Sequence, residues 1–393
     1  MGLFPWHPCS TRDTLSERVH GLYTKAMWHP CTLKSIKLLP MLYCGSHFFR
    51  IFAYNMMRKR LFLMMMAVLT GLCSGAQEPP RMPKALKAGD TIAIISPSST
   101  PSKEVVERGC DALRRWGYVP VVGRHAMNSW HGFAGTAEER AEDLLWALRD
   151  STVKAIMCSR GGDGAVQVLQ RIPLQEFASH PKWIIGFSDA TALHSAAVSA
   201  GVMSIHGTMC EGIAARHEDD PVIVAMRQIL QGRLPVYSAA HHRLDQTGEA
   251  TGILVGGNMS VFCGLAGSDY DFLNRADEGL RVGEPSSGMG LILFIEDTGE
   301  GMSKVDRMLH QIEIRGVLPR LKGIVVGHFS KYKEGESGFE TMYDMLHEYL
   351  KGYDVPVCYD FPIGHHSGKN YPLVEGCRVR LKVTADGTQL DFR

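Results

Sequence analysis

Short apolar runs alternate with amphipathic stretches along the chain from residue 91 onward. Three of these runs are rich in β-branched and aliphatic residues and end at polar or glycine-rich turns, which predicts buried strands: residues 91–95, 155–158 and 183–187. Between the strands, apolar residues recur at helical spacing over residues 106–113 and 136–148, and the second stretch opens with a capping box. This alternation predicts an α/β domain whose parallel sheet is covered by helices on both faces.

Strand patterns dominate the second half of the chain. Apolar or period-two patterns predict six strands, of which the last two are joined by an Asp-Gly hairpin turn: residues 252–255, 291–295, 323–326, 355–359, 378–383 and 389–392. A polar stretch, residues 239–248, separates the two halves. We therefore predict an N-terminal α/β domain over residues 77–238 and a smaller, β-rich C-terminal domain over residues 249–393.

Residues 1–76 do not continue this pattern, and we interpret them as a leader. A cationic stretch at residues 57–60 precedes about a dozen apolar residues and a group of small residues that ends at position 76. A bilayer span needs about 20 apolar residues, so residues 56–76 predict a signal peptide and the true start is expected near Met56. The protein is expected in the periplasm. A lipoprotein anchored through Cys73 fits less well, because the bulky Leu72 precedes that cysteine.

The charge balance narrows the range of partners. Lys and Arg number 42 against 41 Asp and Glu, and 45% of the residues are apolar, which is typical of a nearly neutral globular protein. The chain has no basic stripe beyond residues 58–60, so nucleic acid is not an expected partner. A small molecule is the more fitting substrate.

The cysteines downstream of the leader are scattered singly and mostly lie in apolar segments. The absence of a C-x-x-C pair disfavours zinc ribbons and thioredoxin-type redox chemistry. Buried free thiols are the preferred interpretation, although an oxidising compartment would also permit disulfides.

Candidate chemistry lies in the turns after the strands, because ligand sites of parallel sheets lie at the carboxyl ends of the strands. Ser188 stands in such a turn, residues 186–190, directly before a helix predicted from Asp189 to about residue 200. A sharp strand-to-helix turn exposes a serine hydroxyl and leaves the first helical N–H groups free to bind an oxyanion. By itself the pattern is equally typical of a serine that caps a helix.

A serine nucleophile also needs a base and a third group that orients the base. Of the 17 histidines, His365 is well placed because it lies in a loop after an apolar strand. Glu296 ends the apolar run 291–295, where a carboxylate can be held rigidly against an imidazole. Asp297 and Glu300 compete with Glu296 for this role.

Several short segments together resemble the L,D-carboxypeptidase family of serine peptidases, which includes murein tetrapeptide carboxypeptidases and microcin C7 immunity peptidases. They are residues 133–136 with Arg140 and Asp143, residues 160–164, residues 186–189 with Leu193 and His194, residues 256–258, residues 294–297, and Gly364 with His365. The resemblance extends from about residue 90 to residue 393, with the segments in the family's order.

The resemblance implies a catalytic triad in which Ser188 is the nucleophile, His365 the base and Glu296 the acid. It also implies an α/β N-terminal domain, a smaller β-rich C-terminal domain and a homodimer. The expected activity is hydrolysis of the amide before the terminal D-alanine of murein tetrapeptides, without a metal or another cofactor.

The resemblance further implies where the substrate is held. The oxyanion hole would use the backbone N–H groups of Gly162 and Asp189, and Arg160 and Asn258 are candidates for binding the free carboxylate. The glycine turn usually carries tyrosine where this chain has Asp163. A carboxylate there would repel an anionic group of the substrate or pair with a cationic one.

Three alternative functions compete with this one. An immunity-type peptidase would cleave a peptidyl-nucleotide antibiotic, but export disfavours it because such toxins act on cytosolic targets. A non-catalytic exported peptide-binding protein would have no need of Ser188, Glu296 and His365 together. A metal hydrolase is disfavoured because the histidine pairs are adjacent in sequence and no H-E-x-x-H motif occurs.

Overall fold

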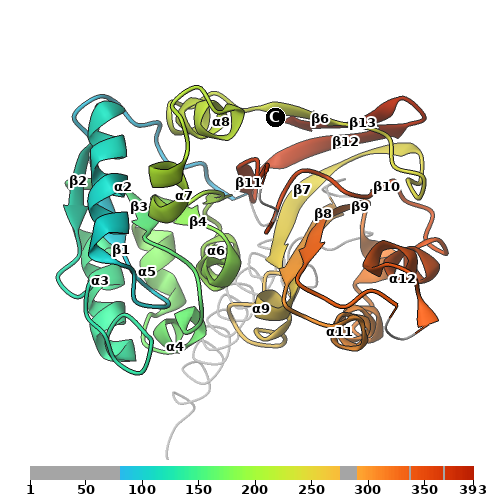
Figure 1. Cartoon of the computed structure of the whole chain (residues 1–393), viewed down its shortest axis with the longest axis horizontal. Coiled ribbons are helices and arrows are strands. Elements are labelled where there is room, and N and C mark those ends of the chain that lie inside the picture. The colour runs from blue at the N-terminus through green and yellow to red at the C-terminus, as the bar shows by residue number, and fades with distance from the viewer. Residues whose placement is uncertain (1–79, 275–289, 336–337, 366–367) are drawn as a thin grey trace, which may run out of the picture. The chain divides into compact units, whose positions relative to one another are not determined.

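The computed structural model describes residues 80–274, 290–335, 338–365 and 368–393 (Figure 1). All of these residues belong to one compact unit, which spans residues 70–393. The predicted leader, its signal peptide and Cys73 lie outside the described residues.

The first sheet has six strands in the order β11-β5-β4-β3-β1-β2. Its members are β1 (Thr91–Ile95), β2 (Val119–Val122), β3 (Val153–Cys158), β4 (Trp183–Gly186), β5 (Ser204–His206) and β11 (Leu373–Glu375). Strands β1 to β5 are mutually parallel, whereas β11 pairs antiparallel with β5. The predicted parallel sheet is confirmed.

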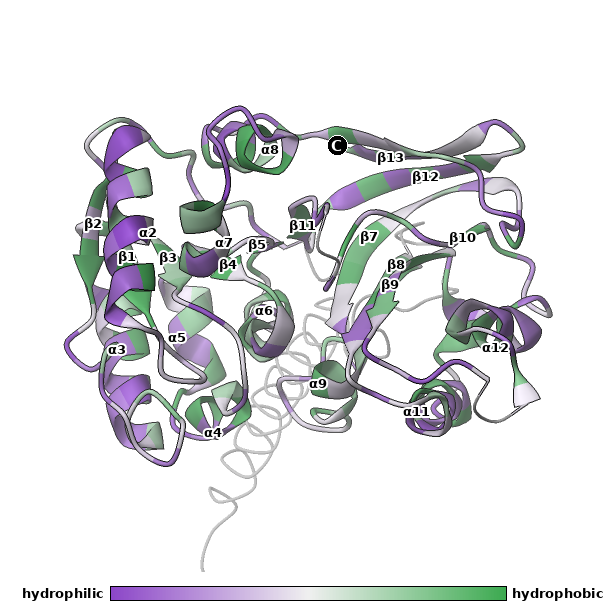
Figure 2. Ribbon diagram, viewed as in Figure 1, coloured by the Kyte–Doolittle hydropathy of each residue, from purple (hydrophilic) through white to green (hydrophobic). Residues whose placement is uncertain are grey.

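Helices cover both faces of this sheet (Figure 1). They are α2 (Lys103–Arg115), α3 (Ala137–Arg149), α4 (Ala165–Leu169), α5 (Leu174–Ser179), α6 (Thr191–Ser199), α7 (Cys210–Ala215) and α8 (Pro221–Leu230). The capping box at Thr136 forms as predicted, since Thr136 and Glu139 exchange side-chain and backbone hydrogen bonds. Figure 2 shows hydrophilic residues along the outer side of α2, whose apolar residues Val106, Cys110 and Leu113 are buried.

The second sheet has seven strands in the order β10-β9-β8-β7-β12-β13-β6. They are β6 (Val236–Ala239), β7 (Gly248–Asn258), β8 (Gly290–Thr298), β9 (Gly323–Ser330), β10 (Val357–Cys358), β12 (Arg378–Thr384) and β13 (Gly387–Phe392). Strands β7 to β10 run parallel, and β12, β13 and β6 extend the sheet antiparallel from β7. The helices beside it are α9 (Met259–Cys263), α11 (Met302–Ile314) and α12 (Met342–Leu350), with a short turn of 3-10 helix, η2 (Leu318–Arg320). The predicted sheet-based C-terminal domain is confirmed.

Two details differ from the sequence prediction. The predicted strand over residues 355–359 is reduced to Val357–Cys358, an edge strand that pairs with β9 and, through Val357, forms an isolated antiparallel bridge to Gln246. The helix expected from Asp189 begins with a 3-10 turn, η1 (Ser188–Ala190), and becomes α-helical at Thr191. The first boundary depends on which segments pair with the strand, and the second on the left-handed backbone of Ser188; local periodicity reports neither.

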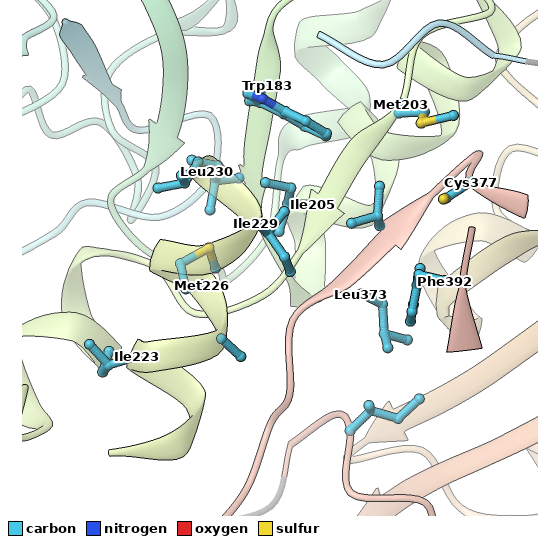
Figure 3. Close-up of a cluster of buried hydrophobic side chains, with 14 of the residues drawn as sticks. Trp183, Met203, Ile205, Ile223, Met226, Ile229, Leu230, Leu373, Cys377 and Phe392 are labelled. Atoms are coloured by element: carbon cyan, nitrogen blue, oxygen red, sulfur yellow. The ribbon is translucent and has the colours of Figure 1, made fainter. Parts of the chain in front are cut away.

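The two halves share strands and core. Strand β11 comes from the end of the chain but completes the first sheet, whereas β6 comes from the predicted N-terminal domain but completes the second. In Figure 3, Ile205 of β5, Met226 of α8, Leu373 of β11 and Phe392 of β13 belong to a single buried cluster. Burying each such side chain contributes about 1.5–3 kcal/mol, so this cluster holds the two sheets together.

Within the described residues, no helix has both the length and the apolar character needed to cross a bilayer. The six cysteines in the described ranges are buried and unpaired: Cys110, Cys158, Cys210, Cys263, Cys358 and Cys377. This agrees with the preferred interpretation of the sequence.

Candidate active site

Ser188 stands directly after β4 in an unusual backbone conformation. Its φ is 64°, a left-handed value that costs an L-residue about 1–2 kcal/mol and that clusters at functional sites. The N-cap residues of η1 and α6 are Phe187 and Ala190, and neither side chain hydrogen-bonds to the helix that it precedes. Ser188 is therefore not the helix cap that the sequence left open as an alternative.

Glycines make this turn possible by letting backbone segments approach closely. A Cβ on Gly186 would lie 2.7 Å from the Cβ of Ala190, and a Cβ on Gly161 would lie 3.0 Å from Ser188 Oγ. Gly162 has φ +120° and packs so closely on Ser99 that no side chain would fit. The glycine turn after β3 thus lies against the Ser188 hydroxyl.

Asp189 ties three loops of the first sheet together. Its Oδ2 accepts a hydrogen bond of 2.6 Å from Ser98 Oγ, after β1, and one of 2.8 Å from the backbone N–H of Ala165, after β3. The carboxyl group is buried, which raises its pKa, and the two hydrogen bonds oppose that rise. Its side chain therefore positions the loops on either side of Ser188.

A buried guanidinium supports the same loops. Arg140 is only 1% exposed, and its Nη1 donates to the carbonyl oxygens of Pro97 at 2.6 Å and Gly164 at 2.9 Å. Its Nη2 donates to Gln167 at 2.6 Å, and the ring of Phe133 lies 5.0 Å from the guanidinium carbon. Arg140 belonged to a segment that carries the family resemblance, but sequence reasoning assigned it no role. Ser98 was also missed, and only its place in a polar turn after a buried strand pointed to it.

Glu296 and His365 form a hydrogen-bonded pair. His365 Nδ1 donates to Glu296 Oε2 at 2.6 Å, and the Glu296 side chain is fully buried at the end of β8. Burial would lower the pKa of His365, but the hydrogen bond and the charge of Glu296 outweigh it, so the pKa is raised above 6.5. Gly364, with φ +98°, allows this approach because a Cβ there would lie 2.7 Å from Glu296 Oε2.

His365 lies beside the Ser188 turn. Its ring centroid is 5.0 Å from that of Phe187, the residue before Ser188. Among the described residues no hydrogen bond joins Ser188 to His365. Such contacts are commonly long in a ligand-free enzyme and tighten when substrate binds.

The two competing carboxylates have other partners. Asp297 accepts hydrogen bonds of 2.7 Å from the backbone N–H groups of Ser260 and Thr298, and burial raises its pKa to about 6. Glu300 forms an ion pair of 2.9 Å with Lys304. Glu296 is therefore the carboxylate that orients His365 in this structure.

Of the two candidate carboxylate-binding residues, Asn258 also has a structural role. Asn258 pairs with Glu296 in the register of β7 and β8, and its Oδ1 caps α9 by accepting from the N–H of Val261 at 3.3 Å. Arg160 Nη1 donates to the carbonyl of Thr100 at 3.4 Å, and its buried Nε has no hydrogen-bond partner in the described chain. Arg160 thus keeps donor capacity near the glycine turn.

His194 is a further positioning residue without a role in the sequence prediction. It is fully buried, and its Nε2 donates to the carbonyl of Gly186 at 2.8 Å, because a carbonyl can only accept. Burial lowers the pKa of His194 to about 4, which keeps the ring neutral. The same carbonyl accepts the N–H of Gly207 at 2.7 Å, so the backbone before Ser188 is held from two sides.

The described ranges contain no group of three or more His, Cys, Asp or Glu side chains arranged to hold a metal ion.

Comparison with known proteins places this geometry in a family. Residues 92–207 match the model of the LD-carboxypeptidase N-terminal domain, and residues 251–381 match that of the LD-carboxypeptidase C-terminal domain. The chain belongs to the LD-carboxypeptidase family. As a member of this family of serine peptidases, the protein is a serine-type carboxypeptidase, as the sequence predicted.

The relatives include both kinds of peptidase named in the sequence analysis, a murein tetrapeptide carboxypeptidase and a microcin C7 immunity protein. The murein tetrapeptide carboxypeptidase of Pseudomonas aeruginosa is 28% identical over 307 residues, which cover 74% of this chain and 94% of that protein. The microcin C7 self-immunity protein MccF of Escherichia coli is 24% identical over 352 residues, covering 80% of this chain and 96% of MccF.

A solved structure agrees with the fold. The muramoyltetrapeptide carboxypeptidase of Oxalobacter formigenes superposes with a TM-score of 0.66 at 25% identity, covering 77% of this chain and 98% of that one. The two-domain architecture of this LD-carboxypeptidase is thus shared with a muramoyltetrapeptide carboxypeptidase.

Proposed function

We propose that this LD-carboxypeptidase removes the terminal D-alanine from murein tetrapeptides with a triad of Ser188, His365 and Glu296. The observation that carries the proposal is the 2.6 Å bond between His365 Nδ1 and buried Glu296, beside a serine held at φ 64°. A histidine oriented by a buried carboxylate next to a strained serine is the arrangement that activates a hydroxyl nucleophile.

In the proposed reaction, Ser188 Oγ attacks the carbonyl carbon before the D-alanine while His365 Nε2 takes the hydroxyl proton. The negative oxygen of the tetrahedral intermediate would accept hydrogen bonds from the backbone N–H groups of Gly162 and Asp189. His365 then gives its proton to the leaving amine, and D-alanine departs. Water, activated by the same histidine, hydrolyses the resulting ester and restores Ser188.

Substrate recognition rests on the polar groups around the turn. Arg160 and Asn258 both stay candidates for the terminal carboxylate, because the Arg160 guanidinium makes a single hydrogen bond within the described chain and the Nδ2 of Asn258 can donate while its Oδ1 caps α9. Asp163 is exposed and makes no side-chain hydrogen bond or ion pair within the described chain. Its exposed negative charge would favour substrates with a cationic group on that side.

The nucleophile is tested by replacing Ser188 with alanine. We expect S188A to lower release of D-alanine from a murein tetrapeptide by about 10⁴-fold or more. S238A, which removes an exposed hydroxyl on β6, is the matched control and should keep full activity. Undiminished product formation by S188A, measured by mass spectrometry, would refute the assignment.

We also propose export to the periplasm and a homodimer. The predicted signal peptide over residues 56–76 supports export, and the family resemblance supports a dimer. The sedimentation mass of the purified protein shows whether it is a monomer or a dimer.

An immunity-type peptidase remains the second candidate, because MccF is among the relatives. Comparing hydrolysis of a murein tetrapeptide with that of an acidic aminoacyl-nucleotide separates the two. A non-catalytic binding protein would cleave neither, and a metal hydrolase would lose its activity to a chelator.

A further inference from the structure

A buried asparagine holds the base of the loop that carries His365. Asn370 is only 5% exposed, and its Oδ1 accepts the backbone N–H of Gly364 at 2.9 Å. The next residue, Tyr371, donates its N–H to the carbonyl of Pro362 at 3.0 Å. These two bonds tie the chain before His365 to the chain after the loop, so Asn370 helps to fix where the histidine is presented.

One polar atom of this asparagine is buried without a partner. Asn370 Nδ2 has no hydrogen-bond partner within the described chain, although Oδ1 is engaged. The amide nitrogen carries two protons that can be donated. Native proteins rarely leave such a buried donor unpaired, because its lost hydration is not replaced. An acceptor close to Asn370 is therefore expected.

The glutamate of the proposed triad has the complementary feature. Glu296 Oε2 accepts from His365 Nδ1 at 2.6 Å, whereas Oε1 is buried and has no hydrogen-bond partner among the described residues. An ionised carboxylate only accepts hydrogen bonds, and a buried one is costly unless both of its oxygens are paired. Glu296 therefore needs a second donor.

Gly364 brings the two side chains to the same backbone unit. Its N–H donates to Asn370, and a Cβ on Gly364 would lie 2.7 Å from Oε2 and 3.0 Å from Cγ of Glu296. The nitrogen and the Cβ position of one residue are only about 2.5 Å apart. The amide and the carboxylate thus border one residue, a separation that a direct hydrogen bond or one bridging water spans.

Asn258 is the alternative donor to the carboxylate. It stands opposite Glu296 in the register of β7 and β8, and its Oδ1 caps α9. The Nδ2 of Asn258 is not among the buried unpaired atoms of the described chain, whereas the Nδ2 of Asn370 is. Asn370 is therefore the donor whose burial requires the bond, and Asn258 stays available to the substrate.

We propose that Asn370 is a positioning residue of the triad, whose Oδ1 fixes the His365 loop and whose Nδ2 donates to Glu296 Oε1, directly or through one bound water. This inference rests on the proposed function and deepens it. A glutamate held at both oxygens keeps the imidazole in the one orientation in which Nε2 serves Ser188. Because Asn370 does not touch the substrate, it acts on kcat more than on KM.

The test is a double-mutant cycle between positions 370 and 296, which measures whether the two side chains act together. N370A should lower kcat for a murein tetrapeptide by about 10- to 100-fold, the range of a hydrogen bond to a charged group, and change KM by less than about twofold. In E296A the same substitution should cost at least about fivefold less, because the carboxylate that it would position is gone.

The pKa of His365, followed by NMR in the S188A background, gives a readout that needs no turnover. Burial lowers this pKa, and the bond to Glu296 raises it. N370A should lower the pKa, because a less firmly held carboxylate bonds more weakly to the ring. N370D keeps an acceptor for the loop but adds a second carboxylate, so it should raise the pKa. Loosening of the loop alone would not shift the pKa in opposite directions.

N274A is the control for a general loss of stability, since Asn274 bonds to Arg315 at 2.8 Å and to none of the three triad residues. It should leave kcat and the pKa of His365 unchanged. The inference is overturned if the costs of N370A and E296A multiply, if N258A couples to E296A in place of N370A, or if N370D leaves the pKa of His365 unchanged.

Failure of the proposed function is distinguishable from failure of this inference. A wild-type protein that cleaves no murein tetrapeptide would refute the function, while the NMR titration would still report whether Asn370 acts on His365. If N370A does not fold, N370D is nearly the same size as the native side chain and decides the question by the same titration.

Discussion

At the scale of single residues, the site combines a strained backbone with buried side chains that hydrogen-bond to the backbone around it. Ser188 adopts φ 64°, while His194 and Gly207 bond to the carbonyl of Gly186 just before it. The hydrogen bonds around the turn offset the cost of the strained residue, which would otherwise relax toward the α or β region. The hydroxyl is presented by the backbone and not by its own hydrogen bonds.

The Glu296–His365 pair makes the activity depend on pH. His365 accepts a proton only when neutral, and its pKa is raised above 6.5, so kcat/KM should fall toward acid at a higher pH than for a free imidazole. E296Q keeps the size of the side chain but removes its charge. We expect the acidic limb to move to lower pH and kcat/KM at the optimum to fall by about 10²- to 10⁴-fold.

The control for this profile is E300Q, because Glu300 pairs with Lys304 and does not bond to His365. Its acidic limb should coincide with that of the wild-type protein. An acidic limb that stays in place in E296Q would show that another group sets the ionisation of His365.

At the scale of elements, three loops at the carboxyl ends of β1, β3 and β4 form one unit. Asp189 bonds to the first two loops from the third, and Arg140 reaches across from α3 to the carbonyls of Pro97 and Gly164. Because buried carbonyls without a partner are costly, these loops can move only if several hydrogen bonds break together. The proposed oxyanion N–H of Gly162 lies in the middle of this unit.

The element-scale prediction is that R140M destabilises the fold and also slows catalysis. Methionine keeps part of the buried volume but leaves the Pro97 carbonyl and the Gln167 side-chain oxygen without a donor and removes one of the two donors to the Gly164 carbonyl, which should cost about 2–4 kcal/mol in urea unfolding. The folded fraction should have a kcat about tenfold or more below wild type, because the glycine turn is no longer held. R171M, which removes an exposed ion pair with Glu138, should cost less than about 1 kcal/mol. Equal stabilities of the two variants would contradict this account.

At the scale of the whole molecule, the two sheets exchange strands, and the residues of the candidate site come from both halves of the chain. Glu296 and His365 come from the second half of the chain and Ser188 from the first, and they meet because β7 reaches α6. The backbone N–H of Asn258 donates to Thr191 Oγ1 at 3.0 Å, and Gly257 packs on the same threonine. With β11 completing the first sheet, neither half carries the proposed triad alone.

The proposed export also concerns the whole chain, and it predicts where the mature protein begins. Cleavage after Ala76 should give a periplasmic protein that begins at Gln77. Edman sequencing of the protein recovered from a periplasmic extract measures this directly. A terminus well upstream of Cys73, or recovery only in the cytoplasm, would contradict export.

Much of the fold was predictable because its signals are local. Period-two and period-3.6 patterns depend on neighbouring residues, so the strands 91–95 and 155–158 and the helix capped by Thr136 were recognised from the sequence. The choice between Glu296, Asp297 and Glu300 was not local, since all three lie within five residues at one strand end. Only the path of the His365 loop, which Gly364 brings onto Glu296, distinguishes them.

The sequence by itself determined the α/β class, the Ser188 turn and the family, because hydrophobic periodicity and short motifs survive without any knowledge of contacts. The tertiary structure decided the strand order, the placement of β11 in the first sheet, the burial of Arg140 and the capping role of Asn258. These features depend on which distant segments pack together, and packing partners are chosen by the free energy of the whole fold and not by local propensity.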